Sequence, residues 1–150
     1  GGSYADSGLT GRKLQCDSYG GLAHHGGGAW SGKDLSKVDR SASYYARYIA
    51  KNIVAANLAS KCEIGIAYAI GIEDPVGISI NTFGTSKIDE EKLLTIIHKV
   101  FDFKPKAIKK AIGINEFYHL STYGHVGVFE SLPWEQTDKV EIIKELTNDY

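Results

Sequence analysis

Apolar residues recur at intervals of three and four positions along four stretches of the chain, and this spacing predicts four α-helices. The longest covers residues 39–59, a stretch rich in alanine and free of glycine and proline. The others are expected at residues 89–103, 104–114 and 137–150. The apolar positions of the first helix are Tyr45, Tyr48, Ile49, Ile53 and Ala56.

The predicted helices carry start signals. Ser36 or Asp39 is expected to cap the first helix, and Thr137 or Asp138 the last, because their side-chain oxygens can accept hydrogen bonds from the N–H groups of a first turn. Pro105 fits near the start of the third helix, where the N–H that proline lacks would have no helical partner.

Alternation of large and small residues predicts strands within residues 62–71 and 76–84, joined by a turn at the sequence EDP. A further short strand is expected within residues 12–20, and residues 123–135 are expected to form a loop. A short turn between neighbouring strands favours antiparallel pairing. The order of elements therefore indicates an α+β fold, with a mostly antiparallel sheet and helices packed on one face.

Composition and charge exclude several classes of protein. The 150 residues suffice for one ordinary domain, and the net charge of −1 at pH 7 excludes a broadly basic nucleic-acid-binding protein. No apolar run approaches the length of a membrane span. Cys16 and Cys62 have neither the spacing of a metal site nor that of a redox pair, so reduced thiols in a cytoplasmic protein are expected. Neither nucleic acid nor a membrane is expected as a partner.

The chain contains no methionine and opens on the glycine-bearing stretch GGSYADSGLTGRK. We therefore expect these residues to be the C-terminal part of a longer protein. Functions inferred from them then require residues of the missing N-terminal part.

Candidate chemistry gathers where glycine is most frequent, since ten of the 17 glycines lie at or before Gly32. In the stretch GGGAWSGKDLSK, glycines let backbone N–H groups turn toward an anion, and Lys33 and Lys37 can reach its oxygens. The spacing is not that of a P-loop, because Asp34 follows Lys33 where serine or threonine is required. By itself this stretch is more typical of a glycine-rich surface loop.

A second glycine-bearing stretch, DSGLTGRK, adds Arg12 and Lys13. Taken alone it is typical of an ordinary turn before a strand. Together the two stretches place four basic residues and two acids in one short region, which suits a triphosphate. An acid in such a region can hold a Mg²⁺ ion that bridges phosphates. The basic residues are Arg12, Lys13, Lys33 and Lys37, and the acids are Asp6 and Asp39, of which Asp39 is the candidate Mg²⁺ ligand.

Several other side chains invite a functional interpretation, but structural roles are favoured for most of them. His24 and His25 are expected to be exposed or structural, and His125 to be a turn histidine bonded to backbone. Trp30 either covers the phosphate loop or stacks on a base, or else anchors the core. The tyrosines near residue 45 are expected to pack on the sheet.

Seven segments in order resemble the C-terminal part of S-adenosylmethionine synthetases (methionine adenosyltransferases). The resemblance covers nearly the whole chain and is densest over residues 1–59. Trp30 stands where that family usually has phenylalanine, but no charged site residue is replaced. The segments are GLTGRK, DSYGG, HGGGAWSGKD, SKVDRSASYYARYIAKNIVAANLA, YAIG, NTFGT and LPWEQTDK.

The resemblance implies an enzyme that joins ATP and L-methionine and requires Mg²⁺ and K⁺. It implies a subunit of three α+β domains related by pseudo-threefold symmetry, active sites shared between two subunits of a homodimer, and commonly a tetramer. Residues 1–39 would hold active-site loops and a strand linked to a neighbouring domain, and residues 40–150 would form the C-terminal domain. The K⁺ ligands are expected outside this chain, and the chain alone is expected to be inactive.

The resemblance also assigns residue roles, position by position. Asp6 corresponds to a residue that contacts the ribose and methionine, and Ala29 to a backbone contact to ATP. Lys37 corresponds to a methionine contact and Asp39 to a carboxylate associated with Mg²⁺. The residues that correspond to catalytic and phosphate-binding groups are Arg12, Lys13 and Lys33.

Two other functions remain open at this point. A non-catalytic regulatory or assembly subunit of the same fold should have lost the basic residues, whereas here they are present. A generic polyphosphate-binding module would bind phosphates without any dependence on methionine. Assays that separate these three hypotheses therefore need both substrates.

Overall fold

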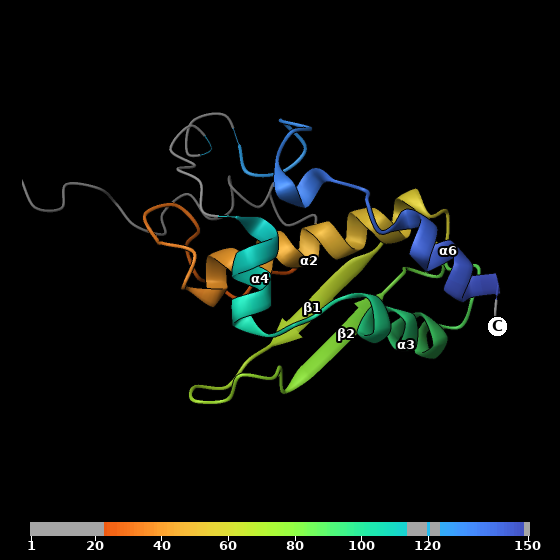
Figure 1. Ribbon diagram of the computed structural model, residues 1–150, viewed down its shortest axis with the longest axis horizontal. Helices are drawn as coiled ribbons and strands as arrows, with labels where there is room; N and C mark the ends of the chain where they lie inside the picture. The colour runs from red at the N-terminus through yellow and green to blue at the C-terminus, as the bar shows by residue number, and fades with distance from the viewer. Residues whose placement is uncertain (1–22, 114–119, 121–123, 149–150) are drawn as a thin grey trace, which may run out of the picture.

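In the computed structural model shown in Figure 1, residues 23–113, 120 and 124–148 are described. Helix α2, Val38–Ala55, runs through the middle of the molecule, with other elements packed on several sides. Its buried side chains include Tyr44, Ile49 and Ile53, none of which is exposed to solvent. The predicted burial of its apolar positions is therefore confirmed, but Tyr44 stacks on Trp134, which is not part of the sheet.

Both ends of α2 differ from the prediction. The residue that precedes its first turn is Lys37, which makes no side-chain capping bond, so neither Ser36 nor Asp39 is the cap. Asp39 instead lies in the first turn, where its charge is favourable to the helix dipole. The helix ends at Ala55 rather than at residue 59, because Asn57 adopts a left-handed conformation with φ of 63° and turns the chain away.

Strands β1, Glu63–Ala67, and β2, Gly77–Asn81, pair antiparallel as predicted, but each is shorter than expected. The sheet has these two strands within the described part of the chain. Helix α2 contacts β1 and α3 contacts β2, and the half-buried isoleucines of both strands pack against the core. The paired isoleucines are Ile64 with Ile80 and Ile66 with Ile78.

Helices α3, Glu90–Val100, and α4, Pro105–Ile112, confirm two further predicted helices. Asp89 caps α3 by accepting a hydrogen bond of 3.0 Å from the N–H of Glu91. Pro105 is the first residue of α4, as predicted, and Gly113 ends that helix with a φ of 82°. Their buried side chains complete the core beside α2 and include Leu93, Ile96, Ile97, Ile108 and Ile112.

Residues 124–148, the last described stretch of the chain, pack along α2 and contain one short helix that was not predicted. Residues Pro133–Glu135 form the 3₁₀ helix η2 inside the predicted loop, and Trp134 of this turn is fully buried. Helix α6, Val140–Asn148, starts after both predicted caps, so neither Thr137 nor Asp138 directly precedes it. Asp138 instead accepts a hydrogen bond from the hydroxyl of Tyr48.

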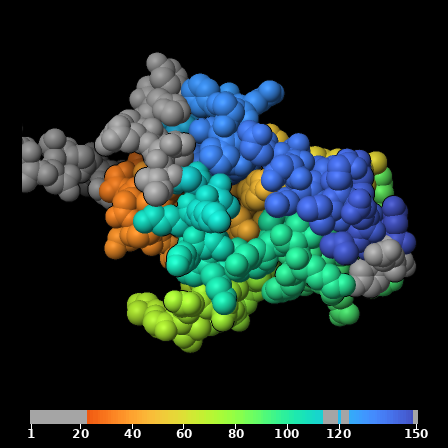
Figure 2. All heavy atoms as spheres, viewed as in Figure 1, coloured from red at the N-terminus to blue at the C-terminus, as the bar shows by residue number. Residues whose placement is uncertain are grey.

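The connection between the two strands, residues 68–76, projects from the molecule at the lower left of Figure 2. Ile70, in this connection, is fully exposed. None of the helices in the described part of the chain combines the length and the apolar character that a membrane span requires. The strand predicted within residues 12–20 lies outside the described residues.

Candidate functional site

The candidate site is the segment of residues 26–39, here called the glycine–lysine loop, which leads into the first turn of α2. Lys33 and Asp39 meet at this turn, with 2.6 Å between the lysine Nζ and the carboxylate Oδ2. Their side chains are 25% and 45% exposed, so water reaches both members of the pair. The structure thus brings together two of the residues singled out from the sequence.

Asp34 gives the loop its shape just after Lys33. Its carboxylate accepts a 2.7 Å hydrogen bond from the N–H of Ser36, and its carbonyl accepts one of 3.2 Å from the N–H of Lys37. The hydrogen bonds from Ser36 lower the pKa of the Asp34 carboxyl group. An aspartate that bonds to a backbone N–H two residues later is typical of a tight turn.

Gly28 lies directly against the carboxylate of Asp39. A Cβ atom at position 28 would come within 2.3 Å of Asp39 Cγ, a distance that no real contact allows. Any side chain at this position would therefore push Asp39 away from Lys33. The sequence indicated that glycine permits close approach here, and the structure shows that the group approached by Gly28 is the carboxylate.

Behind the loop, polar side chains connect it to the core. Arg40 donates from one guanidinium nitrogen to the Lys33 carbonyl at 2.7 Å and from Nε to the hydroxyl of Tyr44 at 3.1 Å. The same hydroxyl lies 2.6 Å from Nδ1 of His125, whose Nε2 lies 3.2 Å from the hydroxyl of Ser31. Four side chains from three segments thus form one continuous series of hydrogen bonds.

Trp30 is 9% exposed and packs edge-on against the rings of Tyr44 and His125. Its indole N–H donates to the hydroxyl of Ser43 at 3.1 Å. Of the three interpretations of Trp30, the structure favours the core anchor. Tyr44 in turn stacks on Trp134 with 3.9 Å between ring centroids, so aromatic packing joins the loop to η2.

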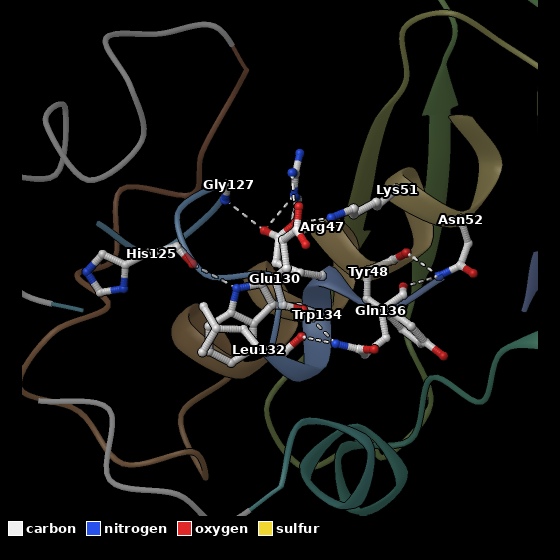
Figure 3. A network of polar contacts seen from close by, with 11 residues as sticks. Arg47, Tyr48, Lys51, Asn52, His125, Gly127, Glu130, Leu132, Trp134 and Gln136 are labelled. Atoms are coloured by element: carbon white, nitrogen blue, oxygen red, sulfur yellow. Dashed lines mark hydrogen bonds and ion pairs between the residues drawn. The ribbon is translucent and has the colours of Figure 1, made fainter. Parts of the chain in front are cut away.

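Figure 3 shows a second polar cluster, between the middle of α2 and η2. Glu135, with a side chain 1% exposed, accepts hydrogen bonds from Lys51 at 2.6 Å, from Arg47 at 3.0 and 3.2 Å and from the Gly127 N–H at 2.8 Å. Burial raises the pKa of Glu135, but these donors outweigh burial and the net pKa lies below its usual value. Nearby, Trp134 donates to the His125 carbonyl at 2.7 Å.

The remaining predicted residues have different outcomes. Ala29 is half-buried in the loop, and Lys37 is exposed at the start of α2. His24 and His25 are exposed as predicted, with His24 paired to Glu63. Asp6, Arg12 and Lys13 lie outside the described residues.

Sequence reasoning missed the groups that support the loop. His125 was expected to be a turn histidine bonded to backbone, whereas its ring is buried with Ser31 and Tyr44 as side-chain partners. Arg40 was not singled out, although its spacing of four residues from Tyr44 is that of side chains on one helix face. Cys62 is a free thiol whose pKa is raised to about 12, first by burial, and so it stays protonated at neutral pH.

The arrangement suits an anion. The ammonium of Lys33 lies at a helix N-terminus, where backbone N–H groups and the helix dipole both favour negative charge. Its present partner is a partly exposed carboxylate, and a phosphate oxygen can take the place of that carboxylate as the acceptor. Asp39 would then be available to a cation beside the phosphate.

Comparison with known proteins extends these observations. The family profile described as S-adenosylmethionine synthetase, C-terminal domain, matches residues 1–136. The S-adenosylmethionine synthase of Leuconostoc mesenteroides is 54% identical over 149 residues, which are 97% of this chain and 39% of that protein. That of Clostridium acetobutylicum is 55% identical over 147 residues, which are 96% of this chain and 38% of that protein.

A solved structure of an S-adenosylmethionine synthetase from Campylobacter jejuni has the same fold, with a TM-score of 0.84 and 39% sequence identity. The match covers 93% of this chain and 38% of that one. The chain therefore spans about two fifths of the length of the relatives that it matches.

Proposed function

This chain belongs to the S-adenosylmethionine synthetase family, as its C-terminal domain, and we propose that the complete protein is a methionine adenosyltransferase. The reaction converts ATP, L-methionine and water to S-adenosylmethionine, phosphate and pyrophosphate. The methionine sulfur attacks C5′ of the ribose, the triphosphate leaves, and water then cleaves the triphosphate. The observation that carries the proposal is the family match over residues 1–136, which includes the loop that pairs Lys33 with Asp39.

Lys33 is proposed to bind the polyphosphate of ATP. Negative charge grows on the triphosphate as its bond to C5′ breaks, and a fixed ammonium stabilises that charge more in the transition state than in the ground state. Arg12 and Lys13 are proposed to act on the same phosphates. Asp6 is proposed to contact ribose and methionine, and the backbone of Ala29 to contact ATP. Lys37 is proposed as a further contact to methionine.

Asp39 is the candidate Mg²⁺ ligand of this domain. The described residues contain no group of three or more histidine, cysteine or acidic side chains that could hold a metal ion by themselves. Mg²⁺ is commonly held by one or two carboxylates together with phosphate oxygens and water, so the single carboxylate of Asp39 beside Lys33 fits that mode. When bound, Mg²⁺ neutralises phosphate charge. The K⁺ ligands are proposed to lie outside this chain.

The complete subunit is proposed to contain three domains of this type and to assemble as a homodimer with shared active sites, or as a tetramer of two such dimers. The proposal rests on the family and on the share of the relatives that this chain spans.

The test uses the protein expressed from its complete reading frame, with ATP, L-methionine, Mg²⁺ and K⁺, and measures S-adenosylmethionine by mass spectrometry. Lys33→Ala is expected to lower kcat about 10²-fold to 10³-fold, as removal of a group that stabilises transition-state charge commonly does. Lys144→Ala is the matched control, because Lys144 also pairs with a carboxylate but lies in α6.

Each result has a distinct meaning. Equal activity of the two lysine variants would show that Lys33 has no phosphate role. A wild-type protein that forms no product would favour the non-catalytic subunit. Binding of ATP with no dependence on methionine would favour the generic polyphosphate module.

A further inference from the structure

The glycine–lysine loop is attached to the core through a buried series of polar side chains to which the proposed function assigns no role. Tyr44 and His125 are completely buried, and the Tyr44 hydroxyl lies 2.6 Å from Nδ1 of His125. Buried polar groups need hydrogen-bond partners, and these two residues find further partners in Arg40 and Ser31. Both ends of the series lie in or next to the loop.

The two ends hold the backbone on either side of Gly32. One end is the side chain of Ser31, bonded to His125, and the other is the carbonyl of Lys33, bonded to Arg40. Between them, Gly32 has a φ of 79°, and a Cβ atom added at this position would meet no other atom within 4 Å. The conformation of this flexible point therefore depends on the contacts of its two neighbours.

The series runs from Arg40 through Tyr44 and His125 to Ser31. Arginine can only donate, so the oxygen of Tyr44 accepts from Arg40. The same hydroxyl contacts Nδ1 of His125, and Nε2 of that ring contacts the hydroxyl of Ser31. Every member thus contributes to one chain of hydrogen bonds, and such chains strengthen each of their links.

We propose that His125 and Tyr44 are positioning residues for Lys33. Through Ser31 on one side and Arg40 on the other, they fix the backbone from which the lysine extends and so determine where its ammonium meets the polyphosphate. This inference rests on the proposed function for its catalytic consequence, whereas its structural consequence, an ordered loop, is independent of that function.

The test compares two substitutions that remove the same atom. Tyr44→Phe deletes the hydroxyl that joins His125 to Arg40 but keeps the ring that stacks on Trp134. Tyr48→Phe is the matched control, because Tyr48 lies one helical turn further along α2 and its hydroxyl bonds to Asp138, away from the loop. Ser31→Ala is the second test variant, in a half-buried residue whose change leaves the core intact.

In the protein expressed from its complete reading frame, Tyr44→Phe and Ser31→Ala are expected to lower kcat/KM for ATP about fivefold to tenfold, as loss of a buried hydrogen bond does. Amide hydrogen exchange over residues 31–37 is expected to accelerate in both variants. Tyr48→Phe should change neither kcat/KM for ATP nor the hydrogen exchange of residues 31–37, even where it lowers the melting temperature.

Two negative results are distinguishable. If wild-type protein forms S-adenosylmethionine but Tyr44→Phe matches Tyr48→Phe in both kinetics and hydrogen exchange, the positioning role is wrong. If wild-type protein forms no product, the proposed function fails, and hydrogen exchange decides about positioning: faster exchange in Tyr44→Phe supports the role, and equal exchange in the two variants overturns it.

Discussion

Two lysine–carboxylate ion pairs in this domain have the same nitrogen–oxygen distance, but one carboxylate is exposed to solvent and the other is buried. Lys33 with Asp39 and Lys51 with Glu135 both have 2.6 Å between nitrogen and oxygen. The carboxylate is 45% exposed in the first pair and 1% exposed in the second. Distance alone therefore does not separate a pair that holds the fold together from one that can exchange its partner for a ligand.

What separates them is the number of donors around the carboxylate and the access of water. Glu135 accepts from two cationic side chains and a backbone N–H, so its negative charge is compensated without solvent. Asp39 lies on the backbone of Gly28 with Lys33 as its ion-pair partner, and solvent reaches both side chains. A phosphate that draws Lys33 away from Asp39 leaves behind a carboxylate that water reaches, whereas removal of a cation from the Glu135 cluster takes a donor from a carboxylate that is almost completely buried.

The largest expected effect on stability follows from Glu135→Ala. The substitution leaves Arg47, Lys51 and the N–H of Gly127 without their shared acceptor. We expect the free energy of unfolding to fall by about 3 kcal/mol, at the low end for a broken buried ion pair because both cations are partly exposed.

Urea denaturation of the protein expressed from its complete reading frame measures this change. Glu141→Ala is the control, because Glu141 is 82% exposed and pairs with Lys144 on the surface of α6. A similar loss in both variants would mean that burial does not distinguish the two ion pairs.

Acid is expected to weaken the buried cluster selectively. The net pKa of Glu135 in the folded protein is below the ordinary value of 4.5, so the unfolded chain binds more protons at mildly acidic pH. The stability that Glu135 contributes is therefore complete above that ordinary value and is lost as the pH falls through the lower folded pKa. Unfolding measured from pH 7 to pH 3 should show a smaller difference between wild type and Glu135→Gln at the acidic end; a constant difference would contradict the prediction.

The periodic elements of the fold were predictable because they depend on local patterns. The spacing of apolar residues located α2, α3, α4 and α6, and alternation located the strand pair. The exact ends of these helices and strands were not predictable, because they depend on the backbone conformation of single residues, such as Asn57 with its left-handed φ. The 3₁₀ turn η2 escaped prediction because three residues are too few for a period, and Trp134 is buried there through contacts with distant residues.

The candidate site was also predictable in part, where it depends on residues close together in the sequence. Lys33 and Asp39 were found from the residue types and their place beside glycines, and the structure shows that they pair. Their support was not found, because Ser31 and His125 are 94 positions apart and no local pattern joins them. The roles assigned to all the site residues stay predictions, those of Lys33 and Asp39 as well as those of Asp6, Arg12 and Lys13.

A smaller loss of stability is expected when a side-chain atom is added next to the exposed ion pair of Lys33 and Asp39. Gly28→Ala places a Cβ atom where the Asp39 carboxylate lies, so the carboxylate must leave Lys33. We expect a loss of about 1 kcal/mol in stability, at the low end for inserting one carbon, because an exposed side chain can move into solvent. Gly26→Ala is the matched control, with open space around it and no positive φ. Urea denaturation of the two variants side by side measures the difference. Equal stability would show that the Asp39 side chain moves away from Lys33 without lowering the free energy of unfolding.

The smallest expected effect completes the comparison. Asp39→Asn removes the charge of the exposed pair while keeping its shape, and exposed ion pairs contribute about 0.2–1 kcal/mol, so the free energy of unfolding should fall by less than about 1 kcal/mol. Because solvent reaches Lys33 and Asp39, salt should reduce even this difference, whereas the loss in Glu135→Ala should persist. Urea denaturation of both variants at low and high sodium chloride tests the contrast. A loss in Asp39→Asn as large as in Glu135→Ala would mean that the exposed pair is structural, and a phosphate could then displace Asp39 from Lys33 only by destabilising the start of α2.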